Sequence, residues 1–234
     1  MEKLVHLLWR TDGFEEGAHA AYLASTVVPE LLGSSAGVRC AEILTTDTSA
    51  AIPRPAILLG GAADLASMVI TWVDCIDDRH VLVDALCSLE GTLGRVDQYL
   101  VTESVPQRWV DRPGGGGIRT PGLTHLSWFP KPDRLTDEQF FHGWHEIHTP
   151  KTPELHPYRT EYVRDSVARV LTAGSPPVRA IVAERFATLE DYTDPSRLYG
   201  SDAALNESVE DLPLYADFET LNSRPTFHTV FADQ

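Results

Sequence analysis

Hydrophobic positions along this 234-residue chain recur with the period of a strand or of a helix. In the first half the pattern predicts strands at 3–9, 67–75 and 97–105 and helices at 15–32 and 77–89. Segment 37–46 fits either a further strand or a helix extension, and 49–55 fits a loop. In the second half the pattern predicts strands at 123–129 and 178–186, helices at 137–148, 158–171 and 195–206, a strand or bent pair of strands at 208–221, and an edge strand at 227–231.

The helix that follows Thr136 has the clearest signals. Thr136 can cap the helix, and Gln139 lies three residues later, as a capping box requires. An apolar stripe at helical spacing ends on an imidazole and consists of Phe140, Phe141, Trp144, Ile147 and His148. Because Pro150 and Pro153 disfavour a continuation, the helix is expected to end at His148.

The two halves of the chain contain an internal repeat. Leu4–Trp9 and Leu123–Trp128 share Leu, His, Leu and Trp at the same four places. The same offset pairs Tyr99, Ser104 and Pro106 with Phe218, Ser223 and Pro225. We interpret the repeat as a tandem duplication with halves at 1–111 and 122–234, joined by a Gly/Pro linker at 112–121.

Each half therefore reads as a β-α-β unit followed by further α and β, which is a ferredoxin-like pattern. Helices cover one face of such a sheet and leave the other face bare. Two halves can cover each other's bare faces, which predicts an α+β fold in which tandem ferredoxin-like repeats form a pseudo-dimeric α/β barrel. The alternative is two separate ferredoxin-like domains.

Composition restricts the possible partners and the compartment. Lys and Arg total 19 against 34 Asp and Glu, a net charge of -15, which disfavours binding to nucleic acid or to anionic membranes. Three cysteines without CxxC spacing indicate reduced thiols in a cytoplasmic protein. The N-terminal sequence lacks the features of a signal peptide, and no apolar run approaches the length of a membrane-spanning helix.

The second half resembles the EthD family of dimeric α/β barrel proteins. The segments that carry the resemblance are FFHGWHEIHTPK, PYRTEYVRD and ERFATLEDYTDPSR. Trp144, His148 and Pro150 fit the family pattern, although Thr149 replaces its usual glycine. In the first half Thr26 falls where His148 would be, so the resemblance implies one site per chain, in the second half.

His148 is the leading candidate for chemistry. Imidazole titrates near neutrality and can serve as a general acid or base, and a helix C-terminus would raise its pKa. The alternative is a structural histidine that bonds a backbone carbonyl. His142, His145 and His148 form HxxHxxH, but steps of three rotate around a helix, so we expect no metal site.

His125 is the second catalytic candidate, and His6 is its counterpart in the repeat. If Leu126 and Trp128 pack under the helices, strand alternation points His125 into the barrel. The alternative is again a structural histidine. The residues expected to bind substrate are Trp128, Trp144, His145, Tyr158, Tyr162, Glu184 and Tyr215, although aromatic residues at these periods are also typical of a simple core.

The sequence shows no GxSxG motif, no Cys–His nucleophile pattern and no dinucleotide fingerprint. We therefore expect a lyase-type enzyme without a cofactor, acting beside the carbonyl of a hydrophobic aromatic or polyketide-like molecule. The alternatives are a cofactorless monooxygenase, which the resemblance also allows, and a non-catalytic small-molecule binding protein. A further homodimer is possible.

Overall fold

The computed structural model describes residues 1–11, 15–34, 37–46, 52, 64–87 and 93–231. These residues form one antiparallel barrel with helices on two sides. The strand order is β2-β3-β1-β4-β7-β8-β6-β9, and a pairing of β2 with β9 closes the ring. The short strand β5 pairs with β9 outside the ring.

The strands are β1 (Glu2–Arg10), β2 (Val38–Thr45), β3 (Leu65–Val73), β4 (Leu93–Gln107), β5 (Ile118–Arg119), β6 (Leu123–Pro130), β7 (Arg159–Val170), β8 (Val178–Phe186) and β9 (Asn222–Val230). The first-half helices are α1 (Glu16–Tyr22), η1 (Leu23–Val27), α2 (Val28–Leu32), η2 (Ile76–Arg79) and α3 (His80–Cys87). The second-half helices are α4 (Asp137–Phe141), η3 (His142–His148), α5 (Thr149–Leu155), α6 (Leu189–Thr193), α7 (Pro195–Leu198), α8 (Asp202–Asp211) and η4 (Leu212–Leu214).

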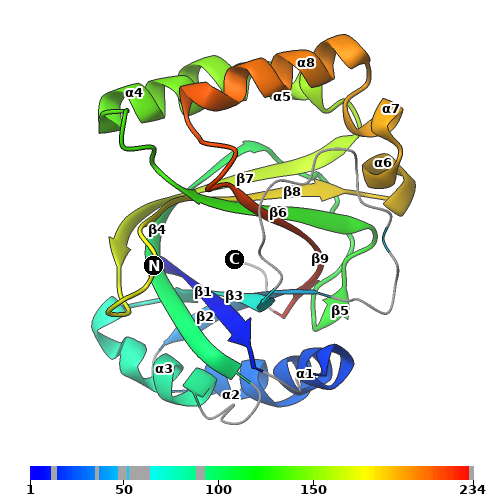
Figure 1. The fold of residues 1–234 in the computed structure, drawn as a ribbon. Helices are drawn as coiled ribbons and strands as arrows, with labels where there is room; N and C mark the ends of the chain where they lie inside the picture. The colour runs from blue at the N-terminus through cyan, green and yellow to red at the C-terminus, as the bar shows by residue number, and fades with distance from the viewer. Residues whose placement is uncertain (12–14, 35–36, 47–51, 53–63, 88–92, 232–234) are drawn as a thin grey trace.

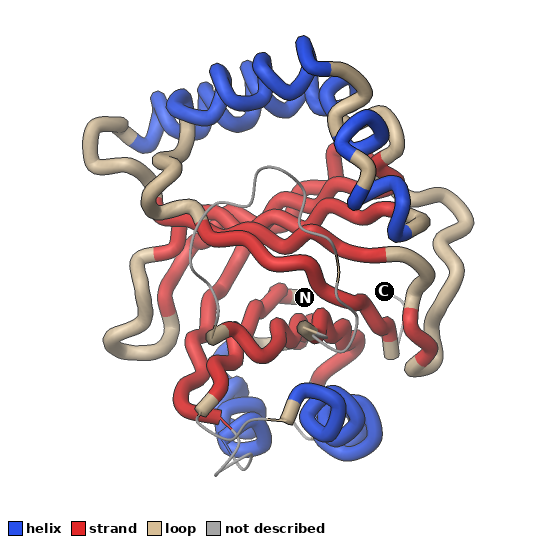
Figure 2. The backbone as a smooth tube through the Cα atoms, turned by 45° about the vertical axis from the view of Figure 1, so that its right-hand side comes forward, coloured by secondary structure: helices blue, strands red, loops and turns tan. Residues whose placement is uncertain are grey.

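The helices lie in two layers with the barrel between them. Figure 1 shows α1, α2 and α3 on one side and α4, α5 and α8 on the other. Figure 2 shows the same arrangement, with the strands between the two helical layers. The bare faces of the two half-sheets therefore face each other across the barrel, as the sequence pattern predicts.

Buried side chains form separate cores inside the barrel and under each helical layer. The interior cluster joins residues of both halves, including Leu7, Ile70, Tyr99, Trp128 and Ile181. A second cluster packs the first-half helices on the outer face of β1 and β3, and a third places Phe129, Phe140 and Trp144 together under the second-half helices. Alternation along each strand thus supplies one core on each face of the sheet.

The capping box at Thr136 is confirmed, because the Thr136 hydroxyl accepts from Gln139 N at 3.2 Å and Gln139 Oε1 accepts from Thr136 N at 2.9 Å. The predicted helix end at His148 is wrong. The helix continues through a π turn, η3, into α5, and the Trp144 carbonyl accepts from both the Thr149 backbone and the Thr149 hydroxyl. We attribute the tolerance of Pro150 to this widened turn, in which the regular ladder is already interrupted.

Three further second-half predictions are wrong. Segment 227–231 belongs to β9, which pairs with both β6 and β2 in the closed ring and so is not an edge strand. Segment 158–171 is the strand β7 and not a helix, because Glu161 and Asp165 are buried in the barrel and not exposed on a helix surface. Segment 208–221 contains the end of α8 and the turn η4 and not a strand, because its apolar residues cover the outer face of the sheet. Segment 37–46 contains the strand β2, so it is a further strand and not a helix extension. The loop predicted at 49–55 lies outside the described residues, except for Ile52.

The sequence match of Leu4–Trp9 with Leu123–Trp128 agrees with the strand pairing. The match of Tyr99, Ser104 and Pro106 with Phe218, Ser223 and Pro225 does not. His6 pairs with Gln98, and the corresponding His125 pairs with Pro225. Gln98 is therefore the structural counterpart of Pro225, and the sequence match of Pro106 with Pro225 is out of register. The predicted linker at 112–121 contains β5, which is hydrogen-bonded to β9.

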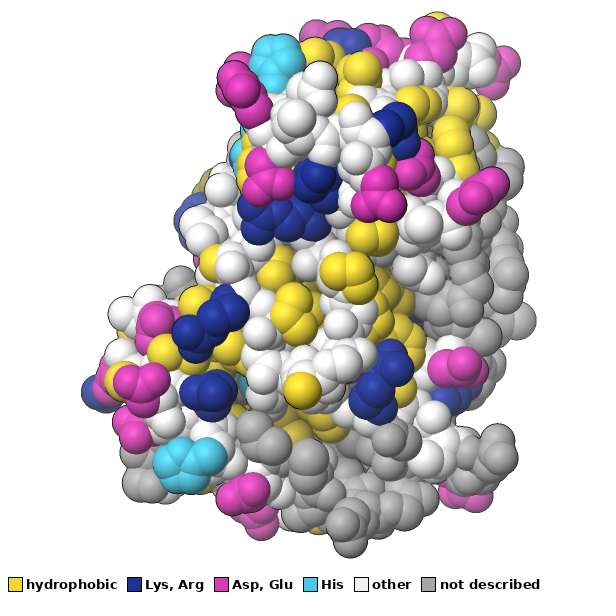
Figure 3. Space-filling model, turned by 60° about the vertical axis from the view of Figure 1, so that its left-hand side comes forward, with side chains coloured by type: hydrophobic (Ala, Val, Ile, Leu, Met, Phe, Trp, Pro, Cys, Tyr) yellow, Lys and Arg dark blue, Asp and Glu magenta, His cyan; other side chains and the backbone are white. Residues whose placement is uncertain are grey.

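The surface mixes charges despite the net charge of -15. Figure 3 shows acidic and basic side chains interspersed on one face, with hydrophobic side chains grouped between the two helical layers. None of the helices in the described part of the chain is both long and apolar enough to cross a membrane.

Candidate functional site

A cavity of about 120 Å³ lies between the second-half helices and the outer face of β6, β7 and β8. Strand residues form its floor, and residues of η3, α8 and the segment after η4 cover it. The side chains that matter chemically are His125, Trp144, His148, His156, Tyr162, Glu184, Tyr199 and Tyr215. The candidate site is therefore outside the barrel ring, beneath the helices.

His125 reaches this cavity from the face opposite to the predicted one. Leu126 and Trp128 belong to the cluster inside the barrel, so alternation places His125 toward the helices. His125 Nδ1 lies 2.9 Å from the Tyr192 hydroxyl. His125 and His148 do line one cavity, but they meet beneath the helices and not in the barrel interior.

Arg159 is positioned by an irregularity in β7. It pairs with Phe186, whereas Glu161 already pairs with Arg185, so two steps along β7 match one step along β8. Such a bulge re-aims a side chain, here toward the helix side of the sheet. There Arg159 Nη1 donates to Glu184 Oε1 at 2.5 Å. The other donors of Arg159 are also occupied, by Gln107 and by Thr152.

The Glu184 carboxylate stays ionised although it is buried. Burial raises its pKa, but the neighbouring His156 and Arg159 outweigh burial and lower the pKa to about 2. His156 Nδ1 donates to the Leu198 carbonyl at 2.9 Å, which fixes its neutral tautomer with the lone pair on Nε2. Arg159 and Glu184 thus place a paired charge at the floor of an otherwise aromatic cavity.

His148 is buried, stacked and unprotonated at neutral pH. Its ring lies 4.8 Å from the Tyr215 ring, measured between centroids. Burial lowers the pKa of His148 to about 4, although Glu184 and Asp211 raise it. The expectation of a raised pKa is wrong, because burial outweighs the nearby carboxylates and the helix does not end at His148. His148 Nδ1 is 3.7 Å from Asp211 Oδ2, and it has no hydrogen-bond partner in the described part of the chain.

Three tyrosines that line the cavity, and Tyr192 beside His125, keep their protons. Burial raises the pKa of Tyr199 to about 12 and also raises the pKa values of Tyr162, Tyr192 and Tyr215. Trp144 Nε1 donates to the Tyr162 hydroxyl at 3.2 Å. Protonated phenols of this kind can donate hydrogen bonds to an oxygen that gains negative charge.

Three of the residues expected to bind substrate lie elsewhere. Trp128 faces the barrel interior, where it packs edge-on against Trp9. Tyr158 is 45% exposed and lies beneath the Arg197 guanidinium. His145 packs against Trp144 and does not line the cavity, because consecutive helical residues point in different directions. The other four, Trp144, Tyr162, Glu184 and Tyr215, line the cavity.

Three cavity residues, Arg159, His156 and Tyr199, were not predicted from the sequence. Arg159 is not evident from sequence because segment 158–171 has the pattern of a helix. The face of the sheet on which Arg159 lies is set by a β-bulge, which no sequence period shows. His156 and Tyr199 follow α5 and α7, and their position depends on how these helices return to the sheet. The sequence around His156 and Tyr199, which includes PYRT and RLYG, has no helical or strand period that would place these two residues on a particular face.

The first half has apolar residues at the ladder positions that correspond to Tyr162 and Glu184. In the second half His125 and Tyr162 both pair with Glu184. In the first half His6 and Ile43 both pair with Val69, and each of these three side chains is buried. The first half therefore lacks a counterpart of the buried carboxylate.

The described residues contain no group of three or more His, Cys, Asp or Glu side chains arranged to hold a metal ion. Within that part of the chain, the HxxHxxH residues also separate. His142 forms an exposed pair with Glu146, His145 packs on Phe141, and His148 faces the cavity.

Comparison with known proteins identifies the fold. A protein provisionally assigned as a monooxygenase from Fusobacterium nucleatum is 8% identical, with 98% of this chain and 91% of that chain aligned at a TM-score of 0.56. An anthrone oxidase-like protein is 13% identical over 98% and 91% of the chains, with a TM-score of 0.60. The chain has an α+β barrel fold.

A third structure, the encapsulated DyP-type peroxidase from Mycobacterium smegmatis, is 12% identical over 97% of this chain and 92% of that chain, with a TM-score of 0.50. No protein-family model and no curated protein matches the chain. The comparisons support the ferredoxin-like barrel and do not show the EthD family.

Proposed function

We propose that this barrel protein is an enzyme that removes a proton beside the carbonyl of a small hydrophobic molecule, with His148 as the general base. The observation that carries the proposal is the state of the cavity. A neutral imidazole, whose Nδ1 has no hydrogen-bond partner among the described residues, lines the same space as an ionised, Arg-bound carboxylate. Such separation of pKa values among neighbouring groups is typical of acid–base sites.

In a dehydration, His148 would take a proton from the carbon beside the carbonyl, and the electron pair would move onto the carbonyl oxygen. Tyr162, Tyr199 and Tyr215 are the phenols available to donate hydrogen bonds to that enolate. The enolate then expels a β-hydroxyl group, which takes the proton back from His148 and leaves as water. Decarboxylation and carbon–carbon cleavage use the same stabilised enolate.

The charges around His148 favour this proton transfer. Glu184 and Asp211 both raise the pKa of His148, so they stabilise the imidazolium that forms during the reaction. Arg159 keeps Glu184 ionised and is itself fully buried. No metal or cofactor is needed for such a step, and the proposal includes none.

The size of the cavity favours a single-ring substrate. The space of about 120 Å³ is close to the roughly 150 Å³ of an apolar cavity that accepts benzene. It is well below the ~300–1,000 Å³ of cavities for drug-sized ligands. A polyketide-sized molecule would require α8 and η4 to move away from the sheet.

A cofactorless monooxygenase is the second candidate, favoured by the fold similarity to the monooxygenase-like and anthrone oxidase-like proteins. It would begin with the same deprotonation. The carbanion would then react with dioxygen, so that a CH₂ group and O₂ give a carbonyl group and water, and the substrate itself supplies the electrons.

We also propose that the two halves, at 1–111 and 122–234, arose by tandem duplication around the segment 112–121. The shared strand order of the halves and the π turn in the first helix of each half support this origin. Val69 in place of Glu184 then explains why only the second half would keep a reactive site.

The test compares His148→Ala with His142→Ala, which removes an exposed imidazole from the same π turn. The probe is 4-hydroxy-4-phenylbutan-2-one in deuterium oxide, followed by NMR for exchange beside the carbonyl and for enone formation. We expect the His148 variant to lose roughly 10²–10⁴-fold in rate and the His142 variant to match the unmodified protein.

Oxygen uptake with a single-ring phenol as probe separates the two enzymatic candidates. Equal exchange by both variants contradicts a role of His148 as base. Calorimetric binding of the probes without turnover by any of the three proteins would favour the non-catalytic binding protein.

A further inference from the structure

A second, larger cavity lies inside the barrel. It measures about 290 Å³, close to the lower limit of about 300 Å³ for small-molecule sites. Its lining comes from β1, β2, β3, β4, β7 and β8 and from the segment after β4. Glu161 and Arg185 line it, whereas their chain neighbours Tyr162 and Glu184 line the helix-side cavity, so one layer of sheet separates the two spaces.

One wall of this interior cavity carries an excess of negative charge. Lys3 Nζ donates to Asp165 Oδ2 at 2.8 Å and to Glu103 Oε1 at 2.6 Å. One ammonium thus faces two carboxylates. Glu103 Oε2 has no hydrogen-bond partner among the described residues. Burial raises the pKa of Asp165 to about 6, which is below neutral pH.

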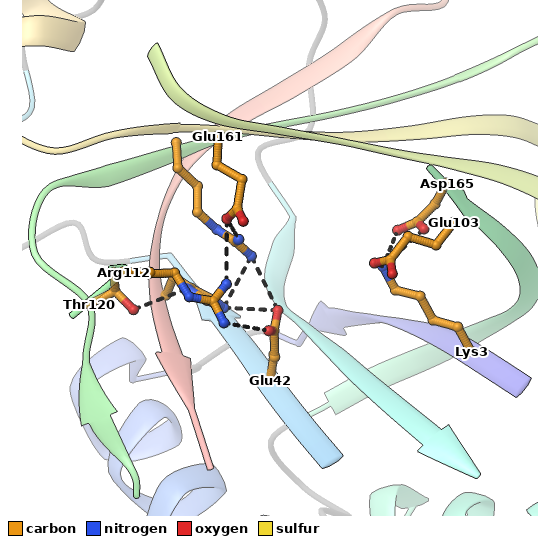
Figure 4. Close-up of polar contacts among 9 residues, drawn as sticks. Lys3, Glu42, Glu103, Arg112, Thr120, Glu161 and Asp165 are labelled. Carbon is orange, nitrogen blue, oxygen red and sulfur yellow. Dashed lines mark hydrogen bonds and ion pairs between the residues drawn. The ribbon is translucent and has the colours of Figure 1, made fainter. Parts of the chain in front are cut away.

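A second charged group is balanced. Arg112 contacts Glu42 and Glu161 at 3.4 Å each, and Arg185 binds the same two carboxylates. His228, which contacts Glu42 at 3.0 Å, is neutral at pH 7 because burial lowers its pKa to about 4. Figure 4 shows this group and the Lys3 group at separate places in the barrel.

Arg108 adds a positive charge to the cavity lining. Its side chain is exposed, and it forms no hydrogen bond or ion pair with any described residue. Trp72, Trp109 and Ile70 provide apolar surface in the same cavity. The lining thus combines an excess negative charge near Lys3, an unpaired guanidinium, and an apolar wall.

We propose that the interior cavity binds a small zwitterion of the free α-amino-acid type with an apolar side chain. The ligand ammonium would lie against Glu103 and Asp165, the ligand carboxylate would bind Arg108, and the side chain would contact Trp72 and Trp109. A guanidinium with all its donors available suits a carboxylate. A singly charged ligand would match only one of the two charged regions.

The experiment is calorimetric titration of the full chain with L-leucine and L-phenylalanine, each beside its N-acetyl and carboxamide forms. Quenching of tryptophan fluorescence gives a second readout through Trp72 and Trp109. We expect the free amino acid to bind at least ten-fold more tightly than either blocked form.

Matched variants locate the site. Arg108→Gln and Glu103→Gln are each expected to weaken binding of the free amino acid at least ten-fold. Arg169→Gln, which removes an exposed charge from β7 outside the lining, should not alter it. Glu103→Gln keeps the side-chain size, and thermal unfolding checks that each variant is folded.

Three results would overturn the proposal. They are the absence of binding by both amino acids, equal binding of a blocked form, and equal binding by the Arg108 and Glu103 variants. Tighter binding of the N-acetyl form would identify a simple carboxylate site instead. None of these residues lines the helix-side cavity, so the outcome is independent of the function proposed for His148.

Discussion

His148 differs from an exposed histidine because burial keeps its imidazole neutral at pH 7. A buried base of this kind needs no deprotonation before it accepts a proton from substrate. Its reactivity depends on Glu184 and Asp211, which stabilise the charged form. The residue itself was evident from its place in the aromatic helix, but its protonation state follows from burial under Tyr215 and α8.

The pH dependence of kcat/KM should report the lowered pKa of His148. The acid limb is expected at about pH 4, the pKa of His148, and not near the 6.5 of an exposed imidazole. Because the Asp211 carboxylate raises this pKa, Asp211→Asn should move the limb to lower pH. A limb near 6.5 in the unmodified protein would show that a different group, or a protonated His148, controls the reaction.

At the scale of the element, the π turn η3 holds Trp144 and His148 over the sheet and brings Gly143 against the backbone of η4. A Cβ at Gly143 would lie 2.4 Å from the Leu214 carbonyl oxygen, closer than packed atoms permit. Only glycine lets these two covering elements approach each other. The contact therefore sets the height of the cavity.

Gly143→Ala should destabilise the fold by about 1–3 kcal/mol, because backbone atoms of η4 must move to accept the added methyl group. The control is Gly17→Ala in α1, where a Cβ meets nothing within 4 Å. The control should be neutral or stabilising by up to ~1 kcal/mol, because alanine favours a helix. Urea unfolding measures both, and equal stabilities would contradict the close approach.

The strand β7 shows how an element can be misread. Its charged residues Glu161 and Asp165 are buried inside the barrel, where Arg185 and Lys3 pair with them. In sequence they resemble the exposed face of a helix. Their partners lie on β8 and β1, so only the tertiary fold shows why a strand with these charges is stable.

At the scale of the whole molecule, burial affects most of the histidines. Burial lowers the pKa of seven of the nine histidines, namely His6, His19, His125, His145, His148, His156 and His228. In the unfolded chain these groups titrate near 6.5. Between that value and the folded values, about 3 for His6 and about 4 for His148, the unfolded state binds more protons.

The protein should therefore lose stability on mild acidification. The contribution of these histidines is complete above about pH 6.5 and is lost as pH falls, by up to about 1.4 kcal/mol per pH unit for each group. Asp165 acts in the opposite direction: its raised pKa, about 6, favours folding at low pH and ceases to do so as pH rises through that value.

Denaturant unfolding between pH 5 and 8 measures this loss. A free energy of unfolding that stays constant from pH 7 to 5 would contradict the burial of neutral histidines. His6→Gln should reduce the pH slope by about one proton, whereas His142→Gln, at an exposed position, should leave the slope unchanged.

The sequence by itself determined the order of most elements, the capping box at Thr136, the barrel class, and His148 and Glu184 as cavity residues. These follow from local periodicity, which is set by which face of each element is buried. Tertiary structure alone decided that the cavity lies beneath the helices, that Arg159 turns toward Glu184 at a bulge, and that His148 is neutral. Those features depend on contacts between segments distant in the chain, and burial and charge pairing across such contacts leave no local period in the sequence.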